Sequence, residues 1–323
     1  MVDELNMEKF QKLLWSFAQH RTLTVAARIG ILERLANCEA TPLELSDELN
    51  LEAMPTEKIV RALYAMGILV ANGATYRVND SLKEMFGSGP ASFLPFMEHS
   101  HDMYDRWGEN LESWVKGGVW TTKKRDSAGI ERFGAAMRAM ASQIATQVVG
   151  ALDLTGVKKM LDVGGGTGTY AEIFCRASQQ LLAVVLDTAQ VATIGRKRLA
   201  STSLEGRVEF LGGDYMEYNY GSGFDLVLLA NVLHQEHGER AARLIKKSAD
   251  ALAPGGRVAV VEFAIDDLKR ERLLGTLFAI NMRSFGDTHC EPEITSWMKA
   301  AFLTDITRID LDQTRWIIVG KKI

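Results

Sequence analysis

The sequence has few of the residues that mark disulfide-rich, fibrous or membrane proteins. It contains three cysteines in 323 residues, Cys38, Cys175 and Cys290, which are far apart and odd in number. They predict neither a disulfide framework nor a Cys-x-x-Cys metal site, and a reducing cytoplasm is the expected location. Six prolines and 28 glycines are too few for proline-rich or collagen-like material.

Long apolar runs and an excess of positive charge are also missing. The longest apolar runs, such as 226–233, are far below the roughly 18 residues that a membrane-spanning helix needs. The acidic N-terminus does not resemble a signal peptide. The 37 basic and 41 acidic side chains give a net charge of −4, which does not suit binding along nucleic-acid phosphates. We therefore expect a cytoplasmic protein with no membrane or nucleic-acid partner.

The chain divides into a mainly helical first part and an α/β second part. The polar, unpatterned segment 121–127 marks the expected join, so we predict two domains, 1–120 and 121–323. In the first part, apolar residues spaced three, four and three positions apart predict a helix with one apolar stripe, and a second helix is expected over 22–36. The stripe consists of Met7, Phe10, Leu14 and Phe17.

The rest of the first part has the pattern of a winged helix. Thr41 and Glu44 form a capping box at the start of a helix. A following helix is expected to end at Gly67, as a C′ glycine would end it. Asn72-Gly73 lies between two β-prone segments and predicts a hairpin. Helix, helix and hairpin in this order indicate a winged-helix domain.

The second part alternates short apolar strands with helical patterns, which predicts a parallel sheet covered on both faces. A helix over 132–152 is expected before the first strand. The connection 312–314 between the last two strands is too short for a crossover helix, so these strands are expected to be antiparallel. The predicted strands are 159–163, 182–186, 208–211, 225–229, 257–263, 305–311 and 315–321.

The most informative segment is the glycine loop after the first strand. The dinucleotide pattern Gly-x-Gly-x-x-Gly fails because Thr169 stands at its third glycine position. The pattern Asp-x-Gly-x-Gly-x-Gly is met by Asp162, Gly164, Gly166 and Gly168, and it belongs to sites for S-adenosylmethionine (SAM). SAM has no phosphate, so its loop needs close backbone approach and a carboxylate for the amino group, for which Asp162 is the candidate. The alternative is a plain turn.

Two further acids follow the next two strands. Asp187 lies 23 residues beyond Gly164, about where a ribose-binding acid belongs, although a helix N-cap is the alternative. Asp214 is the candidate acceptor for the adenine amino group, with Tyr215 or Met216 covering the ring. Its alternative is a turn aspartate.

A histidine and a glutamate are the candidates for acid–base chemistry. His234 ends the fourth strand and Glu262 ends the fifth, at the carboxyl edge where ligands bind in open α/β sheets. His234 is placed to take a proton from an acceptor hydroxyl, and Glu262 to orient the imidazole and favour its protonated form. Structural roles for both are equally open. His237 has no third ligand beside it, so no metal site is expected.

Apolar side chains provide candidates for an acceptor pocket. The segment 271–285 predicts a helix with an apolar stripe, and such stripes are usually core. Side chains of this kind that face the cleft would form a flat slot for an aromatic or polyketide-like acceptor. The candidate walls are Trp107, Met137, Met140, Phe278, Met282 and Phe285.

Four motifs together resemble the class I SAM-dependent methyltransferases, and more closely the caffeic acid/hydroxyindole O-methyltransferase type of plants and bacteria. They are the glycine loop, Gly213-Asp214, the segment 231–234 and the segment 252–257. The resemblance spans nearly the whole chain. It implies a Rossmann-like seven-stranded sheet with an antiparallel last strand, and a winged-helix domain that forms a homodimer and helps to build the pocket. It also implies His234 as the general base and Glu262 as its partner.

The chain departs from this family at two places. Gln235-Glu236 stands where Asp-Trp usually follows the histidine, and 287–290 offers no sure counterpart of a second acid. We interpret the protein as an O-methyltransferase that transfers the methyl group of SAM to a hydroxyl of a small aromatic or polycyclic acceptor. The alternatives are methylation of C or N, non-methylating chemistry on the same fold, and a winged-helix regulator that senses SAM. Against a regulator, residues 1–95 carry nine basic and twelve acidic side chains.

Overall fold

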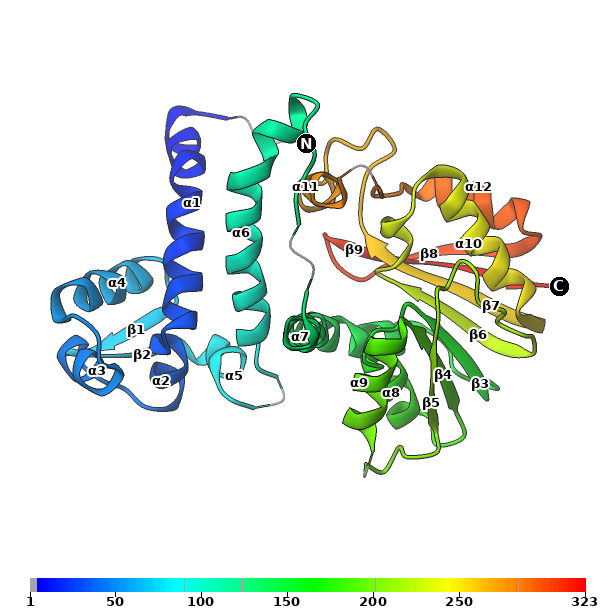
Figure 1. The fold of residues 1–323 in the computed structure, drawn as a ribbon, viewed down its shortest axis with the longest axis horizontal. Coiled ribbons are helices and arrows are strands. Elements are labelled where there is room, and N and C mark those ends of the chain that lie inside the picture. Colours follow the sequence, from blue (N-terminus) through cyan, green and yellow to red (C-terminus); the bar gives the residue numbers. More distant parts are fainter. Residues whose placement is uncertain (1–4, 90, 123–124, 201, 284) are drawn as a thin grey trace. The chain divides into compact units, whose positions relative to one another are not determined.

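The computed structural model describes residues 5–89, 91–122, 125–200, 202–283 and 285–323 (Figure 1). The chain forms two compact units, 2–140 and 141–323. They divide inside helix α7, Ser127–Ala151, about twenty residues beyond the boundary that the sequence predicts. The reason is that α7 is continuous, and its last turns bury Ala145 and Val148 in the core of the second unit.

The first unit is helical with one hairpin. Apolar side chains from α2, α3, α4 and the hairpin form its core, which includes Ile31, Leu35, Leu45 and Leu63. Its elements are α1 (Met7–Arg28), α2 (Ile31–Asn37), α3 (Pro42–Leu49), α4 (Ala53–Ala65), β1 (Leu69–Asn72), β2 (Thr75–Val78), the 3₁₀ helix η1 (Asp80–Leu82), α5 (Lys83–Phe86) and α6 (Leu94–Val115).

Local signals in the first unit are mostly confirmed. Thr41 and Glu44 form both hydrogen bonds of the capping box, Gly67 has a φ of +75° after α4, and β1 pairs with β2 in antiparallel register. The predicted helix over 22–36 is wrong. Helix α1 continues through Arg28, and Gly30 takes a left-handed φ of +85°, a conformation that interrupts a right-handed helix.

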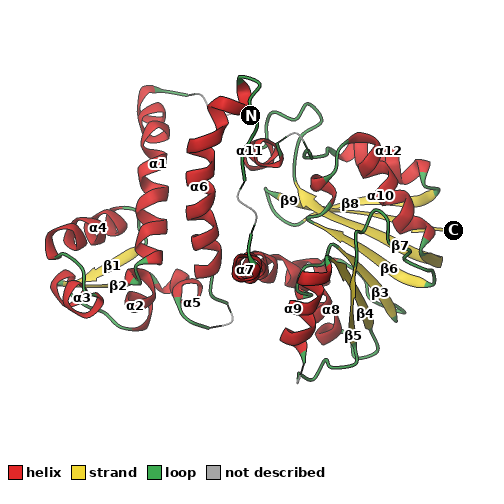
Figure 2. Cartoon of the chain, viewed as in Figure 1, coloured by secondary structure: helices red, strands yellow, loops and turns green. Residues whose placement is uncertain are grey.

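The second unit is built on a seven-stranded sheet (Figure 2). The strand order is β5-β4-β3-β6-β7-β9-β8, and β9 runs antiparallel to both of its neighbours. The predicted fold and the antiparallel last pair are therefore confirmed. The strands are β3 (Lys159–Val163), β4 (Leu182–Asp187), β5 (Val208–Gly212), β6 (Phe224–Ala230), β7 (Leu252–Phe263), β8 (Leu303–Asp310) and β9 (Arg315–Lys322).

Helices cover both faces of this sheet, because alternate strand residues point to opposite faces. Leu161 of β3 belongs to a core that includes side chains of α10 and α12, whereas Met160 belongs to the core formed with α7, α8 and α9. None of the helices in the described ranges is long and apolar enough to cross a membrane. The helices of this unit are α8 (Thr169–Ala177), α9 (Ala189–Leu199), η2 (Leu233–Gln235), α10 (Gly238–Asp250), α11 (Leu273–Met282) and α12 (Glu291–Ala300).

Candidate functional site

The candidate site lies at the carboxyl ends of the parallel strands. Strands β4, β3, β6 and β7 are neighbours in parallel register, so their carboxyl ends meet at one edge of the sheet. The glycine loop follows β3, Asp187 closes β4, the turn with His234 follows β6, and Glu262 lies at the end of β7. In open α/β sheets ligands bind at this edge.

The glycine loop needs glycine for two different reasons. Gly164, Gly166 and Gly168 all have left-handed φ values, of +65°, +60° and +81°. A Cβ on Gly164 would lie 2.6 Å from Val232 Cγ2, and one on Gly168 would lie 2.7 Å from the ring of Phe210. A Cβ on Gly166 would meet no atom within 4 Å. The two outer glycines thus permit close packing, while the middle one leaves open space beside the backbone.

The carboxylate of Asp162 is buried beneath this loop. Asp162 is 0% exposed, and neither oxygen has a hydrogen-bond partner of ordinary geometry among the described residues. A Cβ on Gly165 would lie 2.4 Å from its Cγ. Burial and, second, the charge of Asp187 raise the pKa of Asp162 to about 7, although the Ala171 backbone N–H opposes this. A buried carboxylate with so few partners suits a cationic group.

Replacing Asp162 with asparagine is expected to stabilise the fold above neutral pH. When folding raises the pKa of a carboxyl, the fold becomes less stable as pH rises from the unfolded pKa, here 3.8, towards the folded pKa, here about 7. The gain for Asp162→Asn at pH 8 is at most about 4 kcal/mol, from 1.36 kcal/mol per pKa unit, and it should shrink towards pH 5. Thermal unfolding at pH 5, 6.5 and 8 measures it.

Asp267→Asn, on an exposed loop, is the control for the loss of one negative charge. A stability difference between wild type and Asp162→Asn that does not change with pH would contradict the buried ionisation.

Asp187 anchors the glycine loop through its carboxylate. Oδ2 accepts a hydrogen bond from the Gly166 backbone N–H at 2.9 Å, and Oδ1 accepts one from the Thr188 N–H at 2.7 Å. Burial raises the pKa of Asp187, although these backbone hydrogen bonds oppose the change. An ionised carboxylate has about four lone-pair sites, so two remain for a ligand's hydroxyl groups.

The segment after β5 carries the other predicted cofactor residues. Asp214 is exposed, and its Oδ1 accepts a hydrogen bond from the Met216 N–H at 2.8 Å, as a turn aspartate does. Met216 is 2% exposed among the apolar side chains of the sheet core. Tyr215 is half-buried, so it offers the more accessible side chain for covering an adenine ring.

His234 and Glu262 form a buried pair. The Nδ1 atom of His234 lies 2.7 Å from Glu262 Oε2, and the His234 backbone N–H donates to Oε1 at 3.1 Å. Both side chains are less than a tenth exposed. Burial would raise the pKa of Glu262, but the His234 charge and hydrogen bonds lower it overall. Because a carboxylate only accepts, Nδ1 carries the ring proton and Nε2 is the basic nitrogen.

Aromatic rings line His234 on the side of α11. The Phe278 ring meets the imidazole edge-on with centroids 4.8 Å apart, and Phe263 lies against Phe278 at 4.1 Å. Helix α11 ends at Met282, because Arg283 has a left-handed φ of +60°. The predicted helix to residue 285 is therefore too long, and Phe285 lies beyond it with 73% of its surface exposed.

The other predicted pocket residues belong to the first unit. Trp107 lies on α6, where its ring meets Trp120 edge-on at 6.3 Å. Met137 and Met140 lie on the part of α7 that belongs to this unit.

Sequence reasoning missed several side chains that hold the His234 turn. The His289 side chain donates from Nε2 to the backbone oxygens of Glu236 at 2.8 Å and Leu233 at 3.2 Å. The Glu236 carboxylate accepts from the Tyr215 hydroxyl at 2.8 Å and also pairs with Arg240. The sequence signal for these contacts was that residues 235–236 and 287–290 depart from the family's usual pattern. No local pattern indicates which distant groups these residues contact.

Gly286 also fixes the position of the His234 turn. A Cβ at this residue would lie 2.0 Å from the His234 carbonyl oxygen, which is far inside van der Waals contact. The backbone after α11 therefore approaches the turn at a distance that no other residue permits. Its φ is not left-handed, so the requirement for glycine comes from packing.

The chain matches the O-methyltransferase domain family over residues 106–301. This match covers more than half of the chain, so the protein belongs to that family. It is a SAM-dependent methyltransferase of the hydroxyindole O-methyltransferase-like class, and SAM is its cofactor.

Individual relatives agree with this assignment. The 3-hydroxy-5-methyl-1-naphthoate 3-O-methyltransferase of Streptomyces sahachiroi is 25% identical over 306 residues, which cover 90% of this chain and 87% of that protein. The tetracenomycin polyketide synthesis 8-O-methyl transferase of Streptomyces glaucescens is 24% identical over 96% of this chain and 95% of its own length. Human N-acetylserotonin methyltransferase, solved in complex with SAM, has the same fold, with a TM-score of 0.86 at 20% identity over 100% of this chain and 99% of its own.

Proposed function

We propose that the protein methylates a hydroxyl group of an aromatic, polycyclic acceptor at the carboxyl edge of its sheet. The observation that carries this proposal is the buried His234–Glu262 pair, which lies beside aromatic rings in a turn whose Val232 packs against Gly164 of the glycine loop. Two relatives are named for methyl transfer in naphthoate and polyketide chemistry, which supports an acceptor of that class.

The residues of the carboxyl edge fit SAM. The open space beside Gly166 accommodates a ligand in contact with the backbone, and the poorly partnered Asp162 carboxylate suits the amino group of the methionine part. Asp187 would hold the ribose hydroxyls, and the exposed Asp214 the adenine amino group, with Tyr215 against the ring. When bound, SAM supplies an electrophilic methyl group.

The chain's own residues then perform positioning and proton transfer. His234 takes the proton of the acceptor hydroxyl at Nε2, because Nδ1 is engaged by Glu262. Glu262 stays ionised because His234 lowers its pKa, and it stabilises the imidazolium that forms. Phe278 and Phe263 are apolar neighbours of the ring and exclude water from this side. Met282 and Phe285, which belong to the same unit as His234, are further candidate walls.

The direct test uses SAM and 3-hydroxy-5-methyl-1-naphthoate as the probe acceptor. We expect S-adenosylhomocysteine and a product heavier by one methylene unit, with the methyl group on oxygen, by mass spectrometry and NMR. The same naphthoate with its 3-hydroxyl replaced by hydrogen is the control. Methylation of a ring carbon or of the carboxylate, or a product formed without S-adenosylhomocysteine, would overturn the proposal.

We propose further that helix α1 joins two subunits in a homodimer. Large apolar side chains along its first three turns are exposed in the single chain, among them Leu14 at 58% and Trp15 at 65%. A patch of this kind marks an interaction site. A second copy of α1 is the proposed occupant because its stripe is self-complementary, as a two-fold interface requires. The exposed stripe consists of Met7, Phe10, Leu14 and Phe17, with Leu13 beside it.

A charge in the centre of this stripe is expected to separate the subunits. Leu14→Glu would place a carboxylate in an apolar interface, which costs several kcal/mol, so light scattering at micromolar concentration should give the monomer mass. The control is Gln19→Glu, an exposed position on the opposite side of α1, which should remain dimeric. A wild-type monomer at this concentration would contradict the dimer.

The first unit has a winged-helix order of elements, and we propose that it serves pairing and not nucleic-acid binding. The bridge between Ala40 and Tyr76 adds a third strand-like contact to the hairpin. Residues 1–95 carry three more acidic than basic side chains, which opposes binding to phosphates. A gel-shift assay on genomic fragments is expected to show no complex. We also propose a cytoplasmic location, because the three cysteines form no disulfide and free thiols are typical of a reducing compartment.

A further inference from the structure

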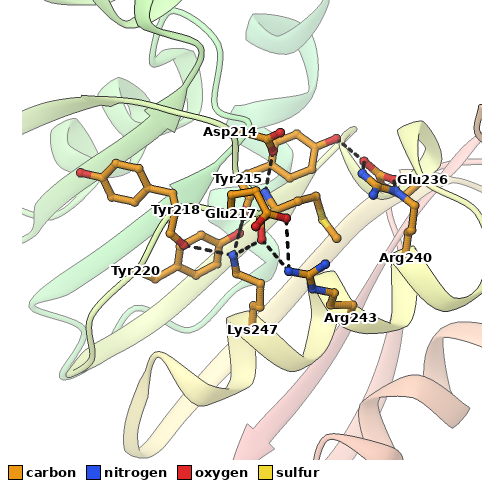
Figure 3. A network of polar contacts seen from close by, with 10 residues as sticks. Asp214, Tyr215, Glu217, Tyr218, Tyr220, Glu236, Arg240, Arg243 and Lys247 are labelled. Atoms are coloured by element: carbon orange, nitrogen blue, oxygen red, sulfur yellow. Dashed lines mark hydrogen bonds and ion pairs between the residues drawn. The ribbon is translucent and has the colours of Figure 1, made fainter.

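Two segments at the carboxyl edge of the sheet are joined by one side-chain hydrogen bond. The Tyr215 hydroxyl donates to Glu236 Oε1 at 2.8 Å (Figure 3). Tyr215 belongs to the segment after β5 that carries Asp214, and Glu236 lies two residues after His234. The bond therefore links the proposed adenine-binding segment to the turn that bears the proposed base.

The segment with Tyr215 is held in place without this bond. Lys247 of α10 donates from Nζ to the backbone oxygens of Tyr215, Met216 and Tyr218 at 2.9, 2.5 and 3.0 Å. Figure 3 shows the contacts of this segment with Lys247. The Tyr220 hydroxyl donates to the Tyr215 backbone oxygen at 2.7 Å. Loss of the Tyr215 hydroxyl should thus leave the segment folded.

Glu236 is tied to the His234 turn through its backbone and to Tyr215 through its side chain. Its backbone oxygen accepts from His289, and its N–H donates to the Leu233 oxygen within the turn at 3.0 Å. The residue is 6% exposed, and its carboxylate forms an ion pair with Arg240. Buried carboxylates are costly unless they are hydrogen-bonded, and here the bonds come from Tyr215 and Arg240.

We propose that the Tyr215–Glu236 hydrogen bond positions His234 relative to the cofactor segment, so that acceptor oxygen, methyl group and proton acceptor stay aligned. Tyr215 and Glu236 are positioning residues in this role, because they act through the His234 turn. Small errors of alignment are costly in such a reaction, and a misplacement of about 1 Å reduces the rate by about 100-fold. The inference rests on the proposed function, since it requires SAM at Asp214 and proton transfer at His234.

The first experiment compares Tyr215→Phe with Tyr218→Phe in the full-length protein. Both remove one hydroxyl from the same segment, but only the first breaks the bond to Glu236. We expect Tyr215→Phe to lower kcat with 3-hydroxy-5-methyl-1-naphthoate about tenfold, with the KM for SAM and the Kd for S-adenosylhomocysteine changed less than threefold. Tyr218→Phe should stay within twofold of wild type in all three values.

Glu236 provides a mutant cycle and a conservative rescue. Glu236→Leu should lower kcat as much as Tyr215→Phe, and the double variant should be no slower than either, because both changes break one contact. Glu236→Gln keeps an acceptor oxygen for the tyrosine, so it should stay within threefold of wild type. Additive losses, or an equal loss in Tyr218→Phe, would overturn the proposal.

A third readout does not depend on the acceptor. The ring Cε1–H signal of His234, assigned by its absence in His234→Gln, should be single and sharp in wild type with S-adenosylhomocysteine bound. It should broaden or divide in Tyr215→Phe. An unchanged signal would overturn the positioning role. Failure of wild type to bind S-adenosylhomocysteine would instead refute the proposed function.

Discussion

Replacing Gly166 with valine is expected to abolish measurable SAM binding. Gly166 has a φ of +60°, and a left-handed conformation costs a residue with a side chain about 1–2 kcal/mol. The β-branched side chain would also occupy the space beside Gly166, where no other atom lies within 4 Å of an added Cβ. The strained backbone is also expected to weaken the hydrogen bond from the Gly166 N–H to Asp187. The proposed SAM contacts at the loop backbone and at Asp187 would then be lost together. Isothermal titration calorimetry measures the affinity.

A matched control separates backbone strain from loss of the ligand's space. Gly206 has a φ of +79°, has open space beside it, and precedes β5 at the opposite end of that strand from Asp214. Gly206→Val therefore carries a similar strain and should bind SAM as wild type does. Wild-type affinity in Gly166→Val, with both variants folded by circular dichroism, would contradict the placement of SAM at this loop.

His234→Ala is expected to lower turnover about 10²–10⁴-fold, the usual range for general acid–base catalysis, with SAM affinity nearly unchanged. Glu262→Gln removes the carboxylate that engages Nδ1, so it should also lower turnover by loosening the orientation of the ring. Steady-state rates between pH 5 and 9 measure the turnover of both variants, and isothermal titration calorimetry measures their affinity for SAM.

The buried Glu262 carboxylate requires a second variant at His234. Without the imidazole, only the His234 backbone N–H and the charge of His289 remain to lower its pKa, and a buried charge with so little compensation destabilises a fold. His234→Gln keeps a side-chain amide that donates to Glu262 and should lose the same activity with less destabilisation. A loss below tenfold, with the acceptor's own ionisation setting the pH profile, would show that alignment alone drives the reaction and that His234 is a pocket wall.

Much of the second unit could be predicted because its signals are local. The predicted strand 159–163 coincides with β3, and the short connection at 312–314 required the antiparallel pair β8–β9. Spacing of apolar residues and turn chemistry act over a few positions, so a single sequence reveals them. The glycine loop is also a local signal, because each of its three motif glycines takes a left-handed backbone conformation at its own position.

Other features could not be predicted because they depend on contacts between distant segments. The sequence indicated α7 as a helix, but the division of the two units inside it follows from which of its turns are buried in the sheet core. Similarly, Met216 is adjacent to a candidate cofactor residue, and only the structure shows that its side chain packs in the sheet core.

The sequence by itself determined the order of the strands along the chain, the glycine loop, and the placement of His234 and Glu262 at strand ends. The tertiary structure decided that Glu262 engages Nδ1 of His234, that His289 and Gly286 hold the turn, and that Tyr215 bonds to Glu236. Periodicity specifies which face of an element is apolar. It does not specify which polar side chains meet across 20 to 60 residues, because those pairings arise only when helices and strands pack in three dimensions.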